Sequence, residues 1–212
     1  SDDGRYVVYA SNAGNIVPGV GSGTIQVYVR DLATDTTALA SRSAAGAAAN
    51  SQSDLGAISP NGRFVSFRSF ATNLAGGPFA SRVYVHDRVT LATSSVPLPV
   101  LNAVTATGCR ENDVADNGVV VLTCFFGSGL FDQVYLHIPG AAGTPFLISS
   151  DINDVAGNQV SGTRVAIDAS GLSMIFDSLA SNLVGNDFNG VSDSFILIDE
   201  GILDGIFADS FE

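Results

Sequence analysis

A tight-turn signal that recurs four times is the sequence feature that most constrains the fold. Each copy has glycine at its fourth position, and successive glycines are 58, 56 and 53 residues apart. Glycine adopts the left-handed conformation that such a turn needs, where a residue with a Cβ is strained. A fixed period of this length indicates a repeat architecture. The four copies are Ser1-Asp2-Asp3-Gly4-Arg5, Ser59-Pro60-Asn61-Gly62-Arg63, Ala115-Asp116-Asn117-Gly118-Val119 and Asp168-Ala169-Ser170-Gly171-Leu172.

The segments between the turns predict four strands per repeat. They are rich in β-branched and aromatic residues and apolar on both faces, as a sheet packed between two neighbours requires. Radial repetition of four-stranded sheets is the architecture of a β-propeller. The expected fold class is therefore all-β, a β-propeller or open partial propeller of about four four-stranded antiparallel blades that start near residues 1, 59, 115 and 168. The first strands after the turns are expected at 6–9, 64–67, 119–122 and 174–176, the second at 26–31, 82–87, 133–137 and 193–199, the third at about 37–42, 92–96 and 145–149, and the strand before the next turn at 55–58 and 163–167.

Polar residues at fixed offsets predict how the loops are held. Asn15, Asn73 and Asn182 each follow a turn glycine by eleven residues, whereas the third copy has Gly129 there. An asparagine side chain in a loop commonly bonds backbone groups, and an aspartate can close a turn by accepting backbone N–H bonds. We therefore expect these asparagines to hold loop backbone. Asp31 and Asp87 are expected to close equivalent turns.

The second copy, with the pattern SPNGRFVSF…ATNL…SRVYVHD, resembles the WD40-like (PD40-type) repeat of TolB-like β-propellers. The resemblance covers residues 1 to about 199. It implies a fold rather than a function, because propellers of this type occur in binding proteins, in periplasmic scaffolds and as accessory domains of enzymes. The same resemblance implies a secreted or periplasmic bacterial location.

Composition excludes several classes of partner. The formal net charge is −12, and the nine basic residues are all scattered arginines. Neutralising phosphates requires clustered basic residues, so nucleic acid and anionic membranes are not expected partners. No apolar run approaches the roughly 18 residues that a membrane-spanning helix needs, so no membrane span is expected.

The two cysteines flank the third turn. Pairing Ala115 with Val119 across that turn places Arg110 opposite Cys124 and Cys109 next to it, within one residue of direct register. We expect a Cys109–Cys124 disulfide, which is typical of exported proteins. The alternative is two reduced, buried thiols in a cytosolic protein.

Candidate site residues are few. Asp187, Asn189 and Asp193 offer oxygens in a spacing that calcium can use, and calcium is the only candidate cofactor. The plain alternative, which we prefer, is a turn rich in Asp, Asn and Gly for backbone reasons. His86 and His137 occupy matching strand positions, and we interpret them as polar strand residues rather than as metal or acid–base groups. No nucleophile–base set is recognisable, so no catalytic residue is predicted.

These observations favour a non-catalytic exported propeller that binds a protein or glycan or scaffolds an assembly. The sequence does not decide whether the chain is an enzyme, and the absence of a recognisable nucleophile–base set favours a chain that is not. One alternative is a glycan-active enzyme or the accessory propeller of an exported hydrolase, because dispersed carboxylates can hide a catalytic pair. Another is a subunit of an extracellular assembly that is joined by strand donation.

Residues 200–212 lie outside the repeat and form a tail. They resemble the short acidic-aromatic tails of many exported gammaproteobacterial proteins. We favour a closing strand at Gly205–Ala208, with a donated strand as the alternative. The first blade is expected to lack its innermost strand, which an upstream segment, a bound cleaved fragment or a neighbouring copy would supply. An open strand edge is a template for another chain, so the native protein is not expected to be an isolated monomer.

Overall fold

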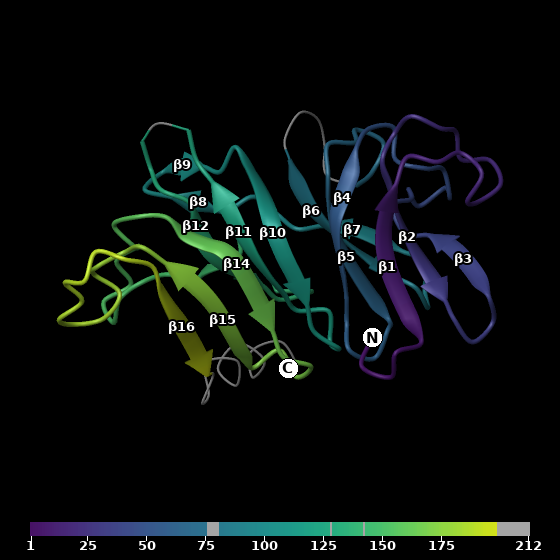
Figure 1. Ribbon diagram of the computed structural model, residues 1–212. Helices are drawn as coiled ribbons and strands as arrows, with labels where there is room; N and C mark the ends of the chain where they lie inside the picture. Colours follow the sequence, from purple (N-terminus) through teal and green to yellow (C-terminus); the bar gives the residue numbers. More distant parts are fainter. Residues whose placement is uncertain (76–80, 128, 142, 199–212) are drawn as a thin grey trace, which may run out of the picture.

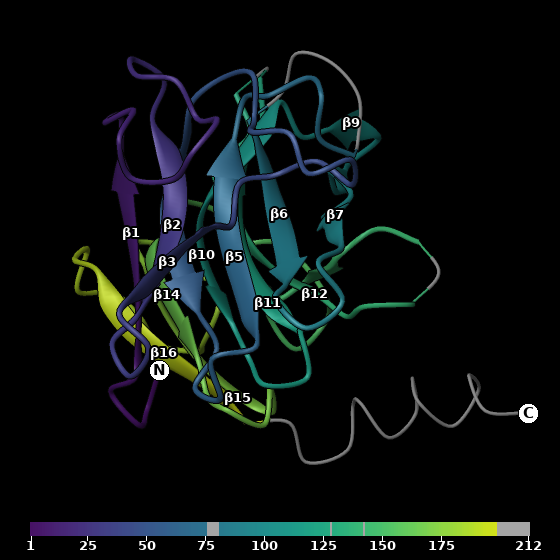
Figure 2. The same cartoon turned by 90° about the vertical axis from the view of Figure 1, so that its right-hand side faces the viewer.

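The computed structural model describes residues 1–75, 81–127, 129–141 and 143–198. The described chain is all-β, as expected, and every pairing between its named strands is antiparallel. Four main sheets, here called blades 1 to 4, lie side by side in chain order from β1 at one side of the molecule to β16 at the other (Figure 1). The second view shows β5, β6 and β7 following one another across one of these sheets (Figure 2). The described residues contain no helix that is long and apolar enough to cross a lipid bilayer.

The blades differ in how many strands they contain. Blades 2 and 3 have four strands, while blades 1 and 4 have three. Among the described residues no innermost strand pairs with the first strand of blade 1, as expected, and the predicted closing strand of blade 4 lies outside that part of the chain. Blade 1 comprises β1 (Tyr6–Ser11), β2 (Gln26–Asp31) and β3 (Thr36–Leu39); blade 2 comprises β4 (Ser53–Ile58), β5 (Phe64–Ser69), β6 (Arg82–Asp87) and β7 (Thr93–Ser95); blade 3 comprises β10 (Gly108–Val114), β11 (Val120–Phe125), β12 (Gln133–His137) and β13 (Phe146–Leu147); blade 4 comprises β14 (Ser161–Ile167), β15 (Ser173–Ser178) and β16 (Asp193–Ile198).

One element was not anticipated. A two-stranded hairpin, β8 (Val100–Leu101) with β9 (Val104–Thr105), lies between blades 2 and 3. Its turn residues Asn102 and Ala103 both have positive φ, a conformation that alanine seldom adopts. Because the sequence there shows no glycine, the usual turn signal was missing.

The four repeated turns form as predicted. In each turn the glycine N–H donates to the carbonyl three residues earlier, at distances between 2.7 and 3.2 Å. All four glycines have positive φ, between 67° and 84°. Gly62 has a second reason to be glycine, because an added Cβ would lie 2.4 Å from the ring of Tyr6 in the preceding blade. The turns of blades 2, 3 and 4 thus pack directly on the preceding blade.

Blades pack through two distinct faces. The face of each blade that carries the Val29, Val85 and Leu136 positions is here called the trailing face, and it contacts the next blade in the chain. The opposite, leading face carries the Val65, Val120 and Met174 positions and contacts the preceding blade. Each internal joint is therefore an apolar layer between one trailing face and one leading face, which provides most of the core.

In blades 2, 3 and 4 a buried pair of small residues lies near the start of the innermost strand. Ser53 Oγ donates to Ser69 Oγ across blade 2, and the equivalent hydroxyls in blade 4, Ser161 and Ser178, are also 2.8 Å apart. In blade 3 the same position holds the Cys109–Cys124 disulfide. The disulfide therefore replaces a hydroxyl pair at a fixed point of the repeat.

The expected disulfide is present, but the expected register around it was wrong. Cys109, and not Arg110, lies directly opposite Cys124. A β-bulge between Cys109 and Asn112 inserts one extra residue into β10, which shifts the pairing by one position. A register shift recurs at the same place in the innermost strands of blades 2 and 4, with one extra residue in blade 2 and two in blade 4, so an irregularity here is a property of the repeat.

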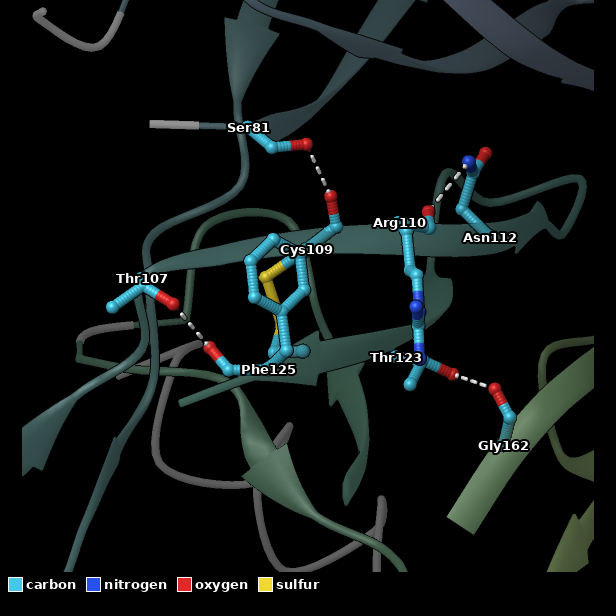
Figure 3. Close-up of a disulfide and its surroundings, with 9 residues drawn as sticks. Ser81, Thr107, Cys109, Arg110, Asn112, Thr123, Phe125 and Gly162 are labelled. Carbon is cyan, nitrogen blue, oxygen red and sulfur yellow. Dashed lines mark hydrogen bonds between the residues drawn. A yellow bond between two sulfur atoms is a disulfide. The ribbon is translucent and has the colours of Figure 1, made fainter. Parts of the chain in front are cut away.

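The disulfide also lies where three blades meet (Figure 3). Ser81 Oγ in blade 2 donates to the Cys109 carbonyl at 2.8 Å. On the other side, Thr123 Oγ1 donates to the Gly162 carbonyl of blade 4 at 2.6 Å. The covalent link thus stiffens the blade that connects its neighbours.

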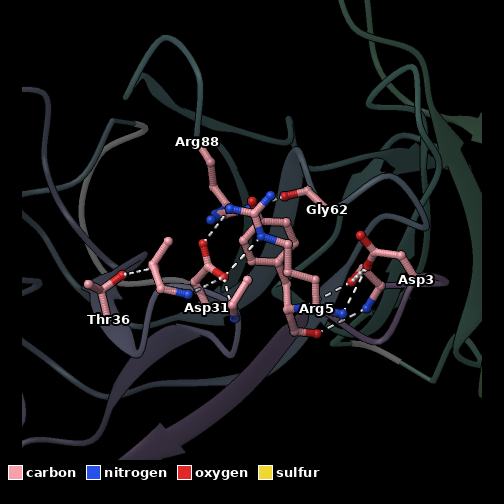
Figure 4. Close-up of polar contacts among 10 residues, drawn as sticks. Asp3, Arg5, Asp31, Thr36, Gly62 and Arg88 are labelled. Carbon is pink, nitrogen blue, oxygen red and sulfur yellow. Dashed lines mark hydrogen bonds and ion pairs between the residues drawn. The ribbon is translucent and has the colours of Figure 1, made fainter.

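An ion pair fastens the repeated turn to the second strand in the first two blades. Arg5 forms a two-point hydrogen bond with Asp31, and Arg63 does the same with Asp87, at distances of 2.8 to 3.1 Å. Figure 4 shows Arg5 and Asp31 together with Arg88, whose guanidinium lies over the Tyr6 ring. The Arg5 guanidinium and backbone N–H donors hold the pKa of Asp31 well below its usual range. Asp31 and Asp87 also accept backbone N–H bonds from their own turns, as predicted.

Candidate functional site

The trailing face of blade 4 is an exposed apolar surface. Ile196 occupies the same repeat position as Val29, Val85 and Leu136. Those three side chains are at most 8% exposed, whereas Ile196 is 65% exposed. Its cross-strand partner Ile175 is 52% exposed, and Ile198 on the same side of β16 is also exposed. Exposed apolar patches of this kind mark interaction surfaces.

A hollow of about 350 Å³ opens beside this face. Ile175, Ala166 and Ser194 line it, and the charged residues Arg164 and Asp177 are also part of the lining. Asp177 accepts hydrogen bonds from the Thr163 hydroxyl and from the Arg164 backbone N–H. The apolar surface is therefore bordered by polar groups that are already fixed in place.

The leading face of blade 1 is the second open surface. Val7 occupies the position of Val65, Val120 and Met174, which are at most 2% exposed, yet Val7 is 45% exposed. Tyr9 stacks on Tyr28 at 5.6 Å between ring centroids, in the way that Phe67 stacks on Tyr84 in blade 2. The two open surfaces therefore have the chemistry of the two sides of an internal joint.

The loop before β16 brings the three calcium candidates together. Asp187, Asn189 and Asp193 line one hollow of about 560 Å³, which Phe188 also borders. The Asn189 side-chain amide donates to both carboxylate oxygens of Asp193, and its oxygen accepts from the Val191 backbone N–H at 2.9 Å. This pattern fits a self-bonded turn better than a calcium site, because calcium requires the amide oxygen. Calcium binding stays a prediction.

His86 lies in the joint between blades 1 and 2. Its Nδ1 is 3.0 Å from Thr93 Oγ1, and that hydroxyl donates to the Arg42 carbonyl at 2.7 Å. Because the Thr93 hydroxyl proton is used in that bond, Thr93 Oγ1 can only accept from His86. His86 Nδ1 therefore carries a proton and donates it to Thr93 Oγ1. Burial, aided by the charges of Arg42 and Arg88, lowers the pKa of His86 to about 4. The side chain is a neutral hydrogen-bond donor within the joint.

His137 occupies the matching position in blade 3 in different surroundings. It borders a hollow of about 400 Å³ that Asp87 and Asn117 also line. Burial lowers the pKa of His137, and Asp87 is held by Arg63 across the same region. His86 and His137 therefore lie in separate environments and do not form one site.

Carboxylates near the inner strands are mostly engaged in structural contacts. Asp54 pairs with Arg68, and Asp132 pairs with Arg110. Burial raises the pKa of Asp113, whose carboxylate accepts the Ile167 backbone N–H of blade 4 at 3.1 Å. Within the described ranges, no group of three or more His, Cys, Asp or Glu side chains is arranged to hold a metal ion.

Sequence reasoning missed one motif that the structure shows to be repeated. Residues 11–15, 69–73 and 178–182 share the pattern Ser-x-Ala-x-Asn. In two of these copies the asparagine side chain bonds backbone groups of the segment that enters the blade, as predicted for Asn73 and Asn182. Aligning the repeats by their asparagines would have revealed the serine as well.

Comparison with the solved structure of a TolB protein supports the propeller fold. TolB from Acinetobacter baumannii, a β-propeller protein, aligns with a TM-score of 0.50 at 16% identity, over 92% of this chain. The chain spans 42% of the TolB chain. Hydrazine synthase from Kuenenia stuttgartiensis aligns with a TM-score of 0.47 at 15% identity, over 98% of this chain and 53% of that one. No protein-family profile matches the chain, and curated protein sequences give no match.

Proposed function

We propose that this chain is an exported, non-catalytic β-propeller scaffold that binds protein through its two open blade faces. The partner surface is a further blade face of the same kind, and a second copy of the chain provides one. The observation that carries the proposal is the 65% exposure of Ile196, at a position that the next blade covers in all three internal joints.

Complementarity supports head-to-tail binding. The open trailing face presents Ile175, Ile196 and Ile198, while the open leading face presents Val7 beside the stacked Tyr9. Internal joints are made from these same two kinds of surface. Contact between different faces of identical copies is heterologous, so it extends into a ring or a filament.

Export is supported by the disulfide, because disulfides persist in oxidising compartments. Since the likeness to TolB concerns the fold alone, it adds no argument about location or partner. Periplasmic or extracellular placement is thus part of the proposal.

Light scattering after size-exclusion chromatography tests the proposal. The chain has a mass of 21.7 kDa, and we expect the measured mass to rise above that value with concentration. Ile196→Asp should return the protein to the monomer mass, because a charge on the open face opposes its burial. Val89→Asp is the matched control, since Val89 is an exposed valine in the outer turn of blade 2 and should leave assembly unchanged. A mass of 21.7 kDa at every concentration would overturn the proposal.

A further inference from the structure

The inner edge of β1 differs from the equivalent strand of every other blade. In blades 2, 3 and 4 an innermost strand pairs with the strand that follows the turn. In blade 1, β1 is itself the edge strand of the sheet. Among the described residues, no strand pairs with the free side of β1. An unpaired edge of this kind can accept an added strand.

Ser11 lies at the position where the other blades form their buried pair. It is the blade 1 counterpart of Ser69 and Ser178, each of which bonds a serine of the innermost strand at 2.8 Å. Ser11 Oγ accepts the Ala13 backbone N–H at 3.2 Å, and Ser69 and Ser178 accept an equivalent N–H bond. The hydroxyl of Ser11 therefore accepts the same backbone bond as its counterparts, but no second serine bonds it within the described residues.

Asn15 lies at the position where the other blades clamp the incoming segment. Asn73 accepts the Asn50 backbone N–H at 2.9 Å and donates to the Ala48 carbonyl at 2.8 Å. Asn182 makes the same two bonds with the backbone of residues 158 and 156, at 2.8 and 3.1 Å. Asn15 is exposed, and within the described residues its side chain makes no hydrogen bond, so the expectation that Asn15 holds loop backbone was wrong.

From these two positions we infer that β1 and residues 11–15 form an acceptor site for one antiparallel β-strand with the pattern Asn-x-x-Ser. The strand's serine pairs with Ser11. The backbone N–H of its asparagine donates to Asn15 Oδ1, and the carbonyl two residues earlier accepts from Asn15 Nδ2. Main-chain bonds to β1 supply affinity, while Ser11 and Asn15 set the register.

The occupant is the innermost strand of another repeat of this kind. Both complete donor segments that pair with a Ser-x-Ala-x-Asn motif carry the pattern, as Asn50-x-x-Ser53 and Asn158-x-x-Ser161. The tail 199–212 does not, because it has no asparagine and only two residues follow its Ser210. The tail sequence is therefore unsuited to this site, and the strand comes from a different segment of polypeptide.

A labelled peptide with the sequence of residues 46–58 is the probe, and fluorescence anisotropy is the measurement. We expect saturable binding to the 212-residue chain. Asn15→Ala removes two hydrogen bonds and should weaken binding at least about tenfold. Ser53→Val within the peptide should weaken it as well. Asn12→Ala is the matched control, since Asn12 is an exposed neighbour whose side chain makes no clamp bond.

Two results would overturn the inference. One is the absence of saturable binding by the unaltered chain, and the other is equal binding by the Asn15→Ala chain. Because Asn15 is exposed, its replacement should leave the fold intact, which circular dichroism would verify. The inference is independent of the proposed function: Ile196→Asp should abolish assembly but leave peptide binding unchanged, so the two proposals can fail separately.

Discussion

The trailing faces of blades 1 to 3 and the trailing face of blade 4 have similar residues but different surroundings. Val29, Val85 and Leu136 are covered by a following blade, whereas Ile196 faces solvent. Apolar residues recur at this position in all four blades, although a following blade buries the position only in blades 1 to 3. Apolar residues at these positions thus reflect the joint between blades rather than the folding of each blade alone, as in other repeat proteins in which each unit is stabilised by its neighbours.

The strongest test of this comparison places one charge at equivalent positions of a covered and an open face. Val85→Asp should lower the free energy of unfolding by about 3 kcal/mol or more, because the carboxylate would be buried without a partner. Ile196→Asp should change it by less than about 1 kcal/mol, since exposed substitutions cost little. Urea denaturation at a low, monomeric concentration measures both. Equal losses would show that the two faces do not differ in cover.

Protonation of His86 probes the first internal joint. The folded state holds the pKa of His86 at about 4, below the unperturbed value of about 6.5, so the unfolded state binds the proton first as pH falls. The stability that neutral His86 contributes is fully present above about pH 6.5. As pH falls towards 4, the free energy of unfolding falls by a total of about 3 kcal/mol on this account.

His86→Gln should therefore flatten the stability profile between these pH values, as measured by urea denaturation at several pH values. The difference between the His86→Gln variant and the unaltered chain removes the contribution of the other titrating groups, including His137, whose own pKa is lowered by burial. A profile for His86→Gln that falls as steeply as that of the unaltered chain would contradict the assignment.

Blade 3 differs from blades 2 and 4 in using a disulfide where they use two serines, and this difference can be measured. Closing a loop of 15 residues stabilises a fold by about 3 kcal/mol in the chain-entropy description. Replacing both cysteines by serine should cost about that amount. Replacing both by alanine should cost about 1 kcal/mol more, because the serines can rebuild the hydroxyl pair of the other blades.

Mass spectrometry without reductant provides the first check, since the disulfide removes two hydrogens. Thermal or urea denaturation of the two double variants provides the second. Freely alkylated thiols in native protein would contradict the bond. Equal stability of the serine and alanine variants would contradict the equivalence of the disulfide and the serine pairs.

The repeat could be predicted from sequence because its signals are local. The four turn glycines, the apolar strands and the backbone-bonding Asn73 and Asn182 each depend on residues close together in the chain, and all appear as expected. The Cys109–Cys124 register was missed because a bulge leaves no clear residue signature. The exposure of Val7 and Ile196 was less predictable. It depends on whether another blade packs against each face, and the periodicity of the sequence does not contain that information.

The loop before β16 should show the smallest effect. If Asp187, Asn189 and Asp193 bind calcium, a chelator should lower the melting temperature by a few degrees, and Asp187→Ala should remove that response. The self-bonded Asn189 argues for a small effect. Differential scanning fluorimetry with and without calcium is sufficient. An unchanged melting temperature would leave the plain turn as the account of this loop.

The most direct test of the central claim, that the two open faces are the halves of one joint, uses two variants that each lack one half. Val7→Asp impairs the leading face and Ile196→Asp impairs the trailing face, so each variant alone should remain a 21.7 kDa monomer. An equal mixture retains one intact face of each kind and should form a heterodimer of twice that mass by light scattering. A mixture that stays monomeric while the unaltered chain assembles, or a single variant that assembles as the unaltered chain does, would contradict the claim.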